Sequence, residues 1–160
     1  MFYNCKSLTN TPNLPSTNIP IDAYLFMFRD CYSLVDVPYL LPGIVVDTDG
    51  YYGMFLNCKA LTNIPNIAAT KFLGNSNCSF MFGSCESLID ARIDLLPLDL
   101  VDSCYSSMFT QCINLTYGPT IHAKSITNKL KDSCRTMFYN CQKLETLEVN
   151  FTEWDIGNTF

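Results

Sequence analysis

The chain has 160 residues, a formal net charge of −5 and a pI near 4.6. This balance argues against nucleic acid as a partner, because phosphate binding needs clustered Lys and Arg, whereas the ten in this chain are scattered. Charged residues make up 16%, against about 25% in an average globular chain, so a largely uncharged polar surface is expected. No apolar run is long enough to predict a membrane span, and this segment has no signal-peptide pattern.

One motif, Met-Phe-x-x-Cys-x-x-Leu, is repeated along the chain. Successive copies begin 26, 27, 27, 27 and 29 residues apart, and every methionine of the protein starts one of them. A fixed period of this size is typical of a solenoid, in which each repeat packs on its neighbours. Residues at the same position in successive repeats are called a column below. The copies start at Met1, Met27, Met54, Met81, Met108 and Met137.

Each repeat is predicted to begin with a short helix. Asp22 precedes Met27 by five residues, where its side chain could cap the first turn of such a helix. Cys78, Phe82 and Cys85 follow the i, i+4, i+7 spacing of a helix face that points inward. The other candidate caps are Asp49, Ser76, Asp102 or Ser103, and Asp132 or Ser133.

A short extended segment is predicted after the Leu of each motif, as at 35–37 and 62–64. Proline occupies one column just beyond it in four repeats, and proline cannot donate a ladder hydrogen bond in a central strand. Strands of about two to four residues are therefore expected. Arg92 and Glu148 replace proline in the fourth and sixth repeats. The four prolines are Pro12, Pro38, Pro65 and Pro119.

The predicted fold is an α/β repeat solenoid. It is a leucine-rich-repeat-like, right-handed stack of six repeats of about 27 residues, each with a short helix and a short parallel β-strand. Residues 1–150 would form the stack, with repeats starting near 1, 27, 54, 81, 108 and 137, and residues 151–160 a C-terminal cap or the start of another module. Because Met1 falls inside a repeat, we expect the chain to be part of a longer protein. The predicted core consists of Met27, Phe28, Cys31, Leu34, Met54, Phe55, Cys58, Leu61, Met81, Phe82, Cys85, Leu88, Met108, Phe109, Cys112 and Leu115.

The repeat unit resembles the BspA-like branch of bacterial leucine-rich repeats. Residues 54–67 show the longer form of that pattern, in which Leu-Thr and then a proline follow the motif. The resemblance extends over residues 1 to about 150. It implies a stacked, non-catalytic surface module of the kind found on bacterial cell surfaces, in some lipoproteins and in similar bacteriophage proteins.

Nine cysteines allow three interpretations. The first is a column of reduced, buried thiols that serve as small apolar filler. The second is one disulfide, most plausibly involving the extra cysteines Cys78, Cys104 and Cys134; it is disfavoured because a disulfide needs facing Cβ atoms, whereas equivalent positions on successive repeats point the same way. The third, a metal site, is disfavoured because no Cys-x-x-Cys pair occurs. We therefore predict no metal and no cofactor.

Catalysis is not expected. His122 is the only histidine, so a Cys-His or Ser-His pair has one possible base. Its column holds apolar or small residues in the other repeats. We interpret His122 as a surface or loop residue, and the protein as a non-enzyme.

The columns nine and twelve positions after Met combine Asn, Tyr and Thr with little charge, a composition that suits contacts to proteins or sugars. We predict an adhesion or interaction module that binds protein or glycan on a bacterial surface or phage virion, outside the cell. The alternative is a structural part of a virion or surface assembly, with no ligand of its own. The candidate binding residues are Tyr32, Tyr39, Asn63, Asn66 and Tyr117.

Overall fold

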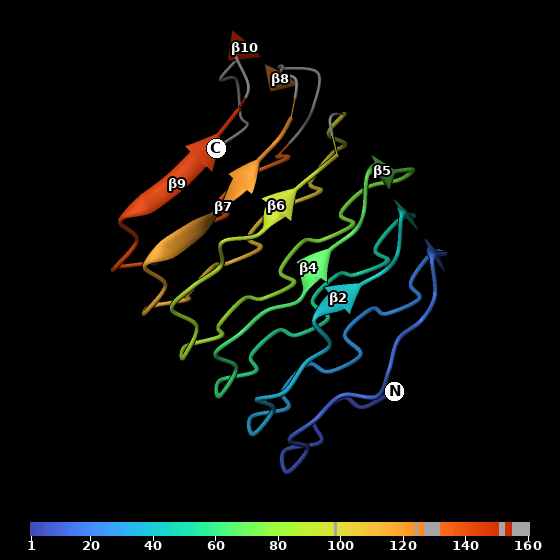
Figure 1. Cartoon of the computed structure of the whole chain (residues 1–160), viewed down its shortest axis with the longest axis vertical. Coiled ribbons are helices and arrows are strands. Elements are labelled where there is room, and N and C mark those ends of the chain that lie inside the picture. Colours follow the sequence, from blue (N-terminus) through green and yellow to red (C-terminus); the bar gives the residue numbers. More distant parts are fainter. Residues whose placement is uncertain (98, 124, 127–131, 151–152, 155–160) are drawn as a thin grey trace.

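The computed structural model arranges the repeats as coils that lie side by side in sequence order. Figure 1 shows this order from the first repeat, in blue, to the last, in red. The structure describes residues 1–97, 99–123, 125–126, 132–150 and 153–154. Every statement below about what is absent concerns these residues.

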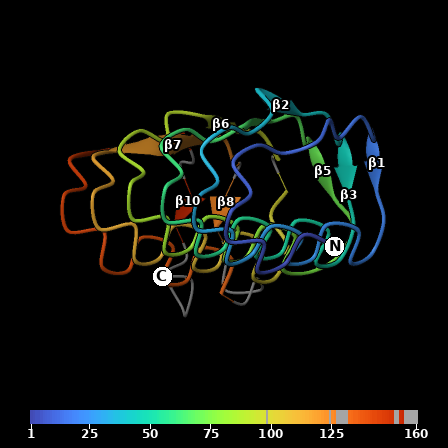
Figure 2. The ribbon, with the colours of Figure 1, turned by 90° about the horizontal axis from the view of Figure 1, so that it is seen from below.

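Short parallel strands connect the coils. Partner residues lie about one repeat apart, as in Asn18 with Val45 and Leu40 with Asn66. The sheets of the described residues have the orders β1-β3-β5, β2-β4, β6-β7-β9 and β10-β8. Figure 2 shows β2, β6 and β7 along one side of the stack and β1, β3 and β5 along another. The strands are β1 (Asn18–Ile19), β2 (Leu40–Leu41), β3 (Val45–Val46), β4 (Asn66–Ile67), β5 (Lys71–Phe72), β6 (Asp94–Leu95), β7 (Tyr117–Ile121), β8 (Ser125–Ile126), β9 (Thr146–Val149) and β10 (Glu153–Trp154).

The strands of the fifth and sixth repeats, β7 and β9, start nine positions after Met, as the sequence predicted, but the earlier strands do not. In the second and third repeats they follow the proline, so that β4 begins directly after Pro65, and segment 35–37 forms only an isolated bridge through Asp36. Proline has no N–H to donate to a neighbouring strand, so strand pairing begins only at residues after it. β7 contains Pro119, and its register with β9 shifts between Tyr117 and Thr120.

The predicted helix of each repeat is absent: no residue that the structure describes is helical. The α/β solenoid with a helix per repeat is therefore wrong. The leucine-rich-repeat and BspA-like descriptions, which carried that expectation, find no support in the structure.

A ribbon of consecutive turns replaces the helix, and we call it the turn segment. Alternate amides bond within the segment, as when the Met27 N–H donates to the Tyr24 carbonyl at 3.1 Å. The amides between them bond to the next repeat, as when the Phe28 N–H donates to the Met54 carbonyl at 2.9 Å. The same Phe-to-Met bond recurs at 2.9 Å in all five junctions between repeats. A helix would use all of these amides locally, so bonding between repeats excludes it.

Every fourth residue of the turn segment has a positive φ, which bends the chain into the next turn. In the second repeat these are Asp22 (57°), Phe26 (50°) and Asp30 (61°). Asn and Asp are several-fold enriched at such angles, which explains why the columns of Asp22 and Asp30 are polar. The Phe26 column also has positive φ, although it contains Phe and Gly as well as Ser and Thr. The residues predicted as helix caps therefore serve as left-handed turn positions. The residues with positive φ in the other repeats are Asn4, Asp49, Gly53, Asn57, Ser76, Phe80, Ser84, Ser103, Ser107, Gln111, Asp132, Thr136 and Asn140.

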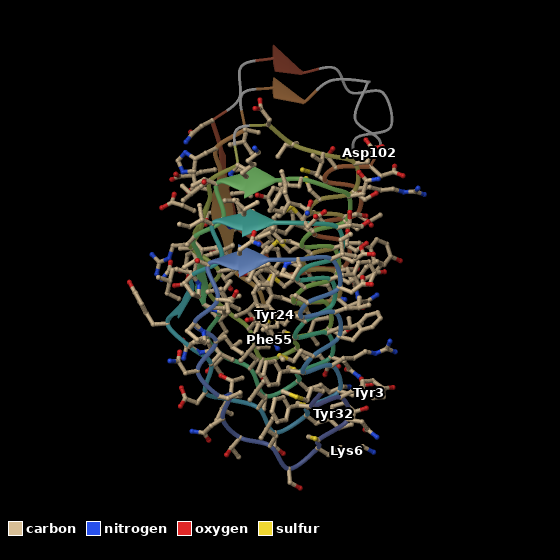
Figure 3. The ribbon with its side chains drawn as sticks, turned by 90° about the vertical axis from the view of Figure 1, so that its right-hand side faces the viewer. Tyr3, Lys6, Tyr24, Tyr32, Phe55 and Asp102 are labelled. Carbon is tan, nitrogen blue, oxygen red and sulfur yellow. The ribbon has the colours of Figure 1, made fainter. Side chains whose placement is uncertain are left out.

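The core runs through the middle of the stack. The sixteen predicted core residues are all buried, and Met27, at 8% exposure, is the most accessible of them. The Phe rings of successive repeats stack almost parallel, with 5.5 Å between the centroids of Phe28 and Phe55 and 5.7 Å between those of Phe55 and Phe82. Figure 3 shows Phe55 inside the stack. Each ring therefore packs on its own copy in the neighbouring repeats.

The motif cysteine has a specific partner. The Cys58 thiol donates to the Phe28 carbonyl of the preceding repeat at 3.1 Å, and the Cys85 thiol donates to the Phe55 carbonyl at 3.3 Å. That carbonyl also accepts the amide of its own repeat, as in Cys31 N–H to Phe28. Thiols are weak donors, but here each one satisfies the second lone pair of a buried carbonyl. The equivalent bonds are those of Cys31 to Phe2, Cys112 to Phe82 and Cys141 to Phe109.

Candidate ligand-binding groove

Three hollows follow one line along the repeats, formed by residues nine to thirteen positions after each Met. We call this line the strand-side groove. The first hollow, of about 270 Å³, lies between residues 11–13 and 36–38. The second, of about 460 Å³, is lined by Asn63, Ile64, Asn66, Asp90, Arg92 and Ile93. The third, of about 180 Å³, is lined by Arg92, Ile93, Asp94, Gly118, Thr120, Thr146, Leu147 and Glu148.

Parallel pairing brings these residues together. Leu40 pairs with Asn66 in β2-β4, and Asp94 pairs with Thr120 in β6-β7. Paired residues project from the same face of a sheet, and here the paired residues stand one column apart, because Leu40 and Asp94 lie thirteen positions after Met and Asn66 and Thr120 lie twelve. The second and third hollows share Arg92 and Ile93, so they continue into each other across the fourth repeat.

Four of the five predicted binding residues lie on or beside this groove. Asn63 and Asn66 line the second hollow. Tyr39 is 85% exposed, and its main-chain carbonyl accepts the backbone amide of Asn66 at 2.9 Å. Tyr117 is half-buried, with its ring centroid 4.9 Å from the Arg92 guanidinium. Tyr39 and Asn66 are thus neighbours in adjacent repeats, whereas Asn63 and Tyr117 lie two repeats apart.

Tyr32 lies apart from the groove. It stands five positions after its Met, in the column of Lys6 and Lys59. The Lys6 ammonium sits 5.6 Å from the centroid of the Tyr32 ring, a cation–π contact. Figure 3 places both side chains at the surface near the first repeat.

Arg92 is a groove residue that was not among the candidates selected from the sequence, although its place in the proline column marks it as an exception. Its Nε donates to both Asp90 carboxylate oxygens at 3.0 Å, and its backbone amide donates to Oδ1 at 2.9 Å. The guanidinium lies over the Tyr117 ring. These contacts fix a charged side chain that is still 67% exposed.

The groove carries more negative than positive charge. Asp36, Asp90, Asp94 and Glu148 line it among the described residues, against one cation, Arg92. Hydrogen bonds from Arg92 hold the pKa of the Asp90 carboxyl below its ordinary value of 3.8, so this pair stays ionised at neutral pH. The groove therefore disfavours anionic ligands.

His122 bridges neighbouring repeats. Its Nε2 lies 2.6 Å from Asp94 Oδ1, and its Nδ1 lies 3.2 Å from the side-chain amide nitrogen, Nδ2, of Asn150. Because the amide donates to Nδ1, the proton of the neutral ring sits on Nε2 and is directed to Asp94. Both nitrogens are thus engaged, and neither is free to activate a nucleophile.

All nine cysteines are free thiols. Burial, with a smaller contribution from Cys31, raises the pKa of Cys58 to about 12, and burial raises that of Cys134 to about 12. The described residues contain no group of three or more His, Cys, Asp or Glu suited to a metal ion. Cys5 is the exposed thiol.

A labelling experiment checks the thiol state. Without reductant, we expect a thiol reagent to modify Cys5 quickly in the native protein, because the other thiols are at least partly covered and protonated. In denaturant, mass spectrometry should show modification at most of the nine cysteines. Two or fewer modified thiols in denaturant would mean that disulfides are present.

Aromatic side chains also gather on the outer face of the turn segment, and we call them the turn-side row. Phe26 meets Tyr52 edge-on with centroids 5.2 Å apart, and Tyr52 lies 5.8 Å from Phe80. The Arg29 guanidinium lies 4.9 Å from the Phe26 centroid. Gly53 makes this packing possible, because a Cβ there would lie 2.5 Å from the Phe26 ring.

The chain was compared with protein-family models, curated proteins and solved structures, and none of them matches it. No helix in the described part of the chain is long and apolar enough to cross a membrane.

Proposed function

We propose that this protein is a non-catalytic binding module that holds an elongated ligand, a protein segment or a glycan, in the strand-side groove. The observation that carries the proposal is the alignment of the three hollows along one line across the repeats. A short ligand would need only one hollow. A polymer could contact equivalent columns of several repeats at once, as extended repeat surfaces allow.

The chemistry of the groove suits such a ligand. Asn63 and Asn66 supply amide donors and acceptors, and Tyr39 supplies an exposed ring that loses little rotamer freedom on binding. Asp90 and Arg92 neutralise each other. Binding should therefore depend on hydrogen bonds and ring contacts more than on attraction between net charges.

We place this activity outside the cell, on a bacterial surface or a phage particle, as the repeat motif suggests. The thiols are compatible with that location. Burial raises the pKa of Cys85 and Cys112 well above their ordinary range, and the thiolate is the form that oxidises.

A double variant tests the groove. Tyr39→Ala with Asn66→Ala should weaken binding to the best ligand from immobilised glycan and peptide panels by about tenfold or more, measured by biolayer interferometry. The matched control is Tyr139→Ala, because Tyr139 is also exposed, at 61%, but lies on the turn segment. Wild-type affinity should change little between low and high salt.

The groove proposal fails if the double variant binds as tightly as the wild type. It also fails if Tyr139→Ala weakens binding to the same degree. Circular dichroism of each variant confirms that a loss of binding is not a loss of folding.

A second candidate role is that of a structural subunit in a larger assembly, and the turn-side row is the observation that favours it. Aromatic residues and Arg are enriched at the centres of protein interfaces, and Phe26, Arg29, Tyr52 and Phe80 form such a set. In that role Tyr52→Ser with Phe80→Ser would reduce co-sedimentation with the assembly. The groove variant would leave co-sedimentation unchanged.

A further inference from the structure

Arg92 is held so that one edge of its guanidinium faces outward. Asp90 takes the Nε edge, and Tyr117 covers one face of the plane. Nη1 has no hydrogen bond to another side chain of the described residues. A guanidinium fixed in this way loses little freedom when it binds an acceptor, because its geometry is already set.

The acceptor that Arg92 can bind is an uncharged one. Asp90 already neutralises the guanidinium, and Asp94 and Glu148 line the adjoining hollow. A carboxylate, sulfate or phosphate placed at Nη1 would be repelled by these groups. A carbonyl oxygen would accept the same hydrogen bond without that repulsion.

The hollow next to Arg92 offers an apolar surface beside this donor. Ile64 is half-buried and Ile93 is 7% exposed, and both line the hollow together with Asn63 and Asn66. A ligand group with a carbonyl oxygen and a methyl side by side would meet the donor and the apolar surface together. An acetamido group has this shape.

The backbone in the groove argues against an extended peptide. A peptide that adds a strand to a sheet needs free backbone donors and acceptors at an edge. Here the Asn66 amide donates to Tyr39, and the Thr120 amide donates to the Ile93 carbonyl at 2.9 Å. The groove therefore presents mainly side chains, which suit the hydroxyl and acetamido groups of a sugar.

We infer that the strand-side groove binds an uncharged glycan whose sugar units carry acetamido groups, and that Arg92 is the residue that recognises the acetamido carbonyl. The Tyr39 ring, one repeat before Asn66 in the same column, stacks on the face of a neighbouring sugar ring. This inference rests on the proposed function and names its ligand.

Isothermal titration with defined oligosaccharides tests the ligand. The probes are a hexamer of β-linked N-acetylglucosamine, the same hexamer without acetyl groups, and a hexamer of β-linked glucose. We expect the acetylated hexamer to bind about tenfold or more tightly than the glucose hexamer, with little effect of salt. The deacetylated hexamer is cationic, so tighter, salt-sensitive binding of that probe would overturn the inference.

Variants of Arg92 test the recognising residue. Arg92→Gln should weaken binding of the acetylated hexamer about tenfold and weaken binding of the glucose hexamer less, because that probe has no acetamido carbonyl. Arg92→Pro restores the common residue of the column and should show the same loss. The matched control is Arg135→Gln, because Arg135 is also exposed and paired with a carboxylate, Asp132 at 3.4 Å, but lies on the turn segment.

The outcomes separate this inference from the function beneath it. If a peptide or another glycan binds, and Tyr39→Ala with Asn66→Ala abolishes that binding, the groove stands and the acetamido inference is wrong. If no member of the glycan and peptide panels and none of the hexamers binds in the groove, the groove proposal and the acetamido inference are both wrong. Equal losses in Arg92→Gln and Arg135→Gln would overturn the role of Arg92.

Discussion

Replacing Phe55 by Ala should lower the free energy of unfolding by about 3–5 kcal/mol, as measured by urea denaturation. Phe55 is fully buried and stacks on Phe28 and Phe82 in the neighbouring repeats. Its loss would leave a cavity bounded on both sides by rings that the backbone hydrogen bonds hold in place.

Phe2→Ala is the control for this variant. Phe2 stacks on Phe28 at 5.3 Å and is only half-buried, so its truncation removes a contact on one face. The expected loss is about half that of Phe55 or less. Equal losses at the two positions would contradict a core in which each ring is supported by the repeats on both sides.

Raising the pH above about 9 should unfold the protein, because the buried thiols cannot ionise in the folded state. Burial raises the pKa of Cys58 and Cys134 to about 12 and that of Cys141 to about 11. In the unfolded chain these thiols ionise near their ordinary pKa. A raised folded pKa gives stability that is present below the unfolded pKa and lost as the pH rises toward the folded pKa.

Between its unfolded and its folded pKa, each such thiol lowers the free energy of unfolding by up to about 1.4 kcal/mol per pH unit. The combined loss from several thiols exceeds the roughly 5–15 kcal/mol stability of a typical domain before pH 12 is reached. Urea denaturation in the presence of reductant, at intervals from pH 7 to 11, measures the slope. Cys58→Ala should make the slope shallower by the share of one thiol, whereas Cys5→Ala, at an exposed position, should not change it. A stability that stays constant to pH 11 would contradict burial of the thiols.

The period and the core of the fold can be predicted from the sequence because both depend on side-chain pattern. Met, Phe, Cys and Leu recur in fixed columns, and a residue that packs on its own copy must be conserved from repeat to repeat. Phe28 and Leu61 are fully buried for this reason. Nothing beyond the spacing of the motif was needed to identify them.

The turn segment could not be predicted in the same way because its periodicity imitates that of a helix. Spacings such as Cys78 to Phe82 fit a helix of 3.6 residues per turn, and they fit equally a ribbon with a positive φ at every fourth residue. The hydrogen bonds that decide between the two run from one repeat to the next, so they are invisible in a local window. A column such as Asp30, Asn57 and Ser84, polar in every repeat, is the signal that favours positive φ.

The groove was partly predictable. The columns nine and twelve positions after Met, which contain Asn63, Asn66 and Tyr117, stood out in the sequence by their composition. Parallel pairing between repeats places these columns along one side of the stack. Arg92 stood out in the sequence only as a departure from proline. Its importance depends on Asp90 and on the Tyr117 ring of the next repeat, and the second of these contacts is made only in the folded structure.

The one-way hydrogen bonds of the turn segments also give that side of the stack an electrical polarity. On the turn side of each junction the amide of the earlier repeat points toward the later one, as in Phe28 N–H to Met54. On the strand side many amides of the later repeat point toward the earlier one, as in Thr120 N–H to Ile93. Along the turn segments, the face of the first repeat is then negative and the face of the last positive. Lys6 and Arg29, near the first face, offset part of its potential. The strand-side bonds that point the opposite way set up an opposing dipole, so the two sides of the stack carry opposite polarity along its length.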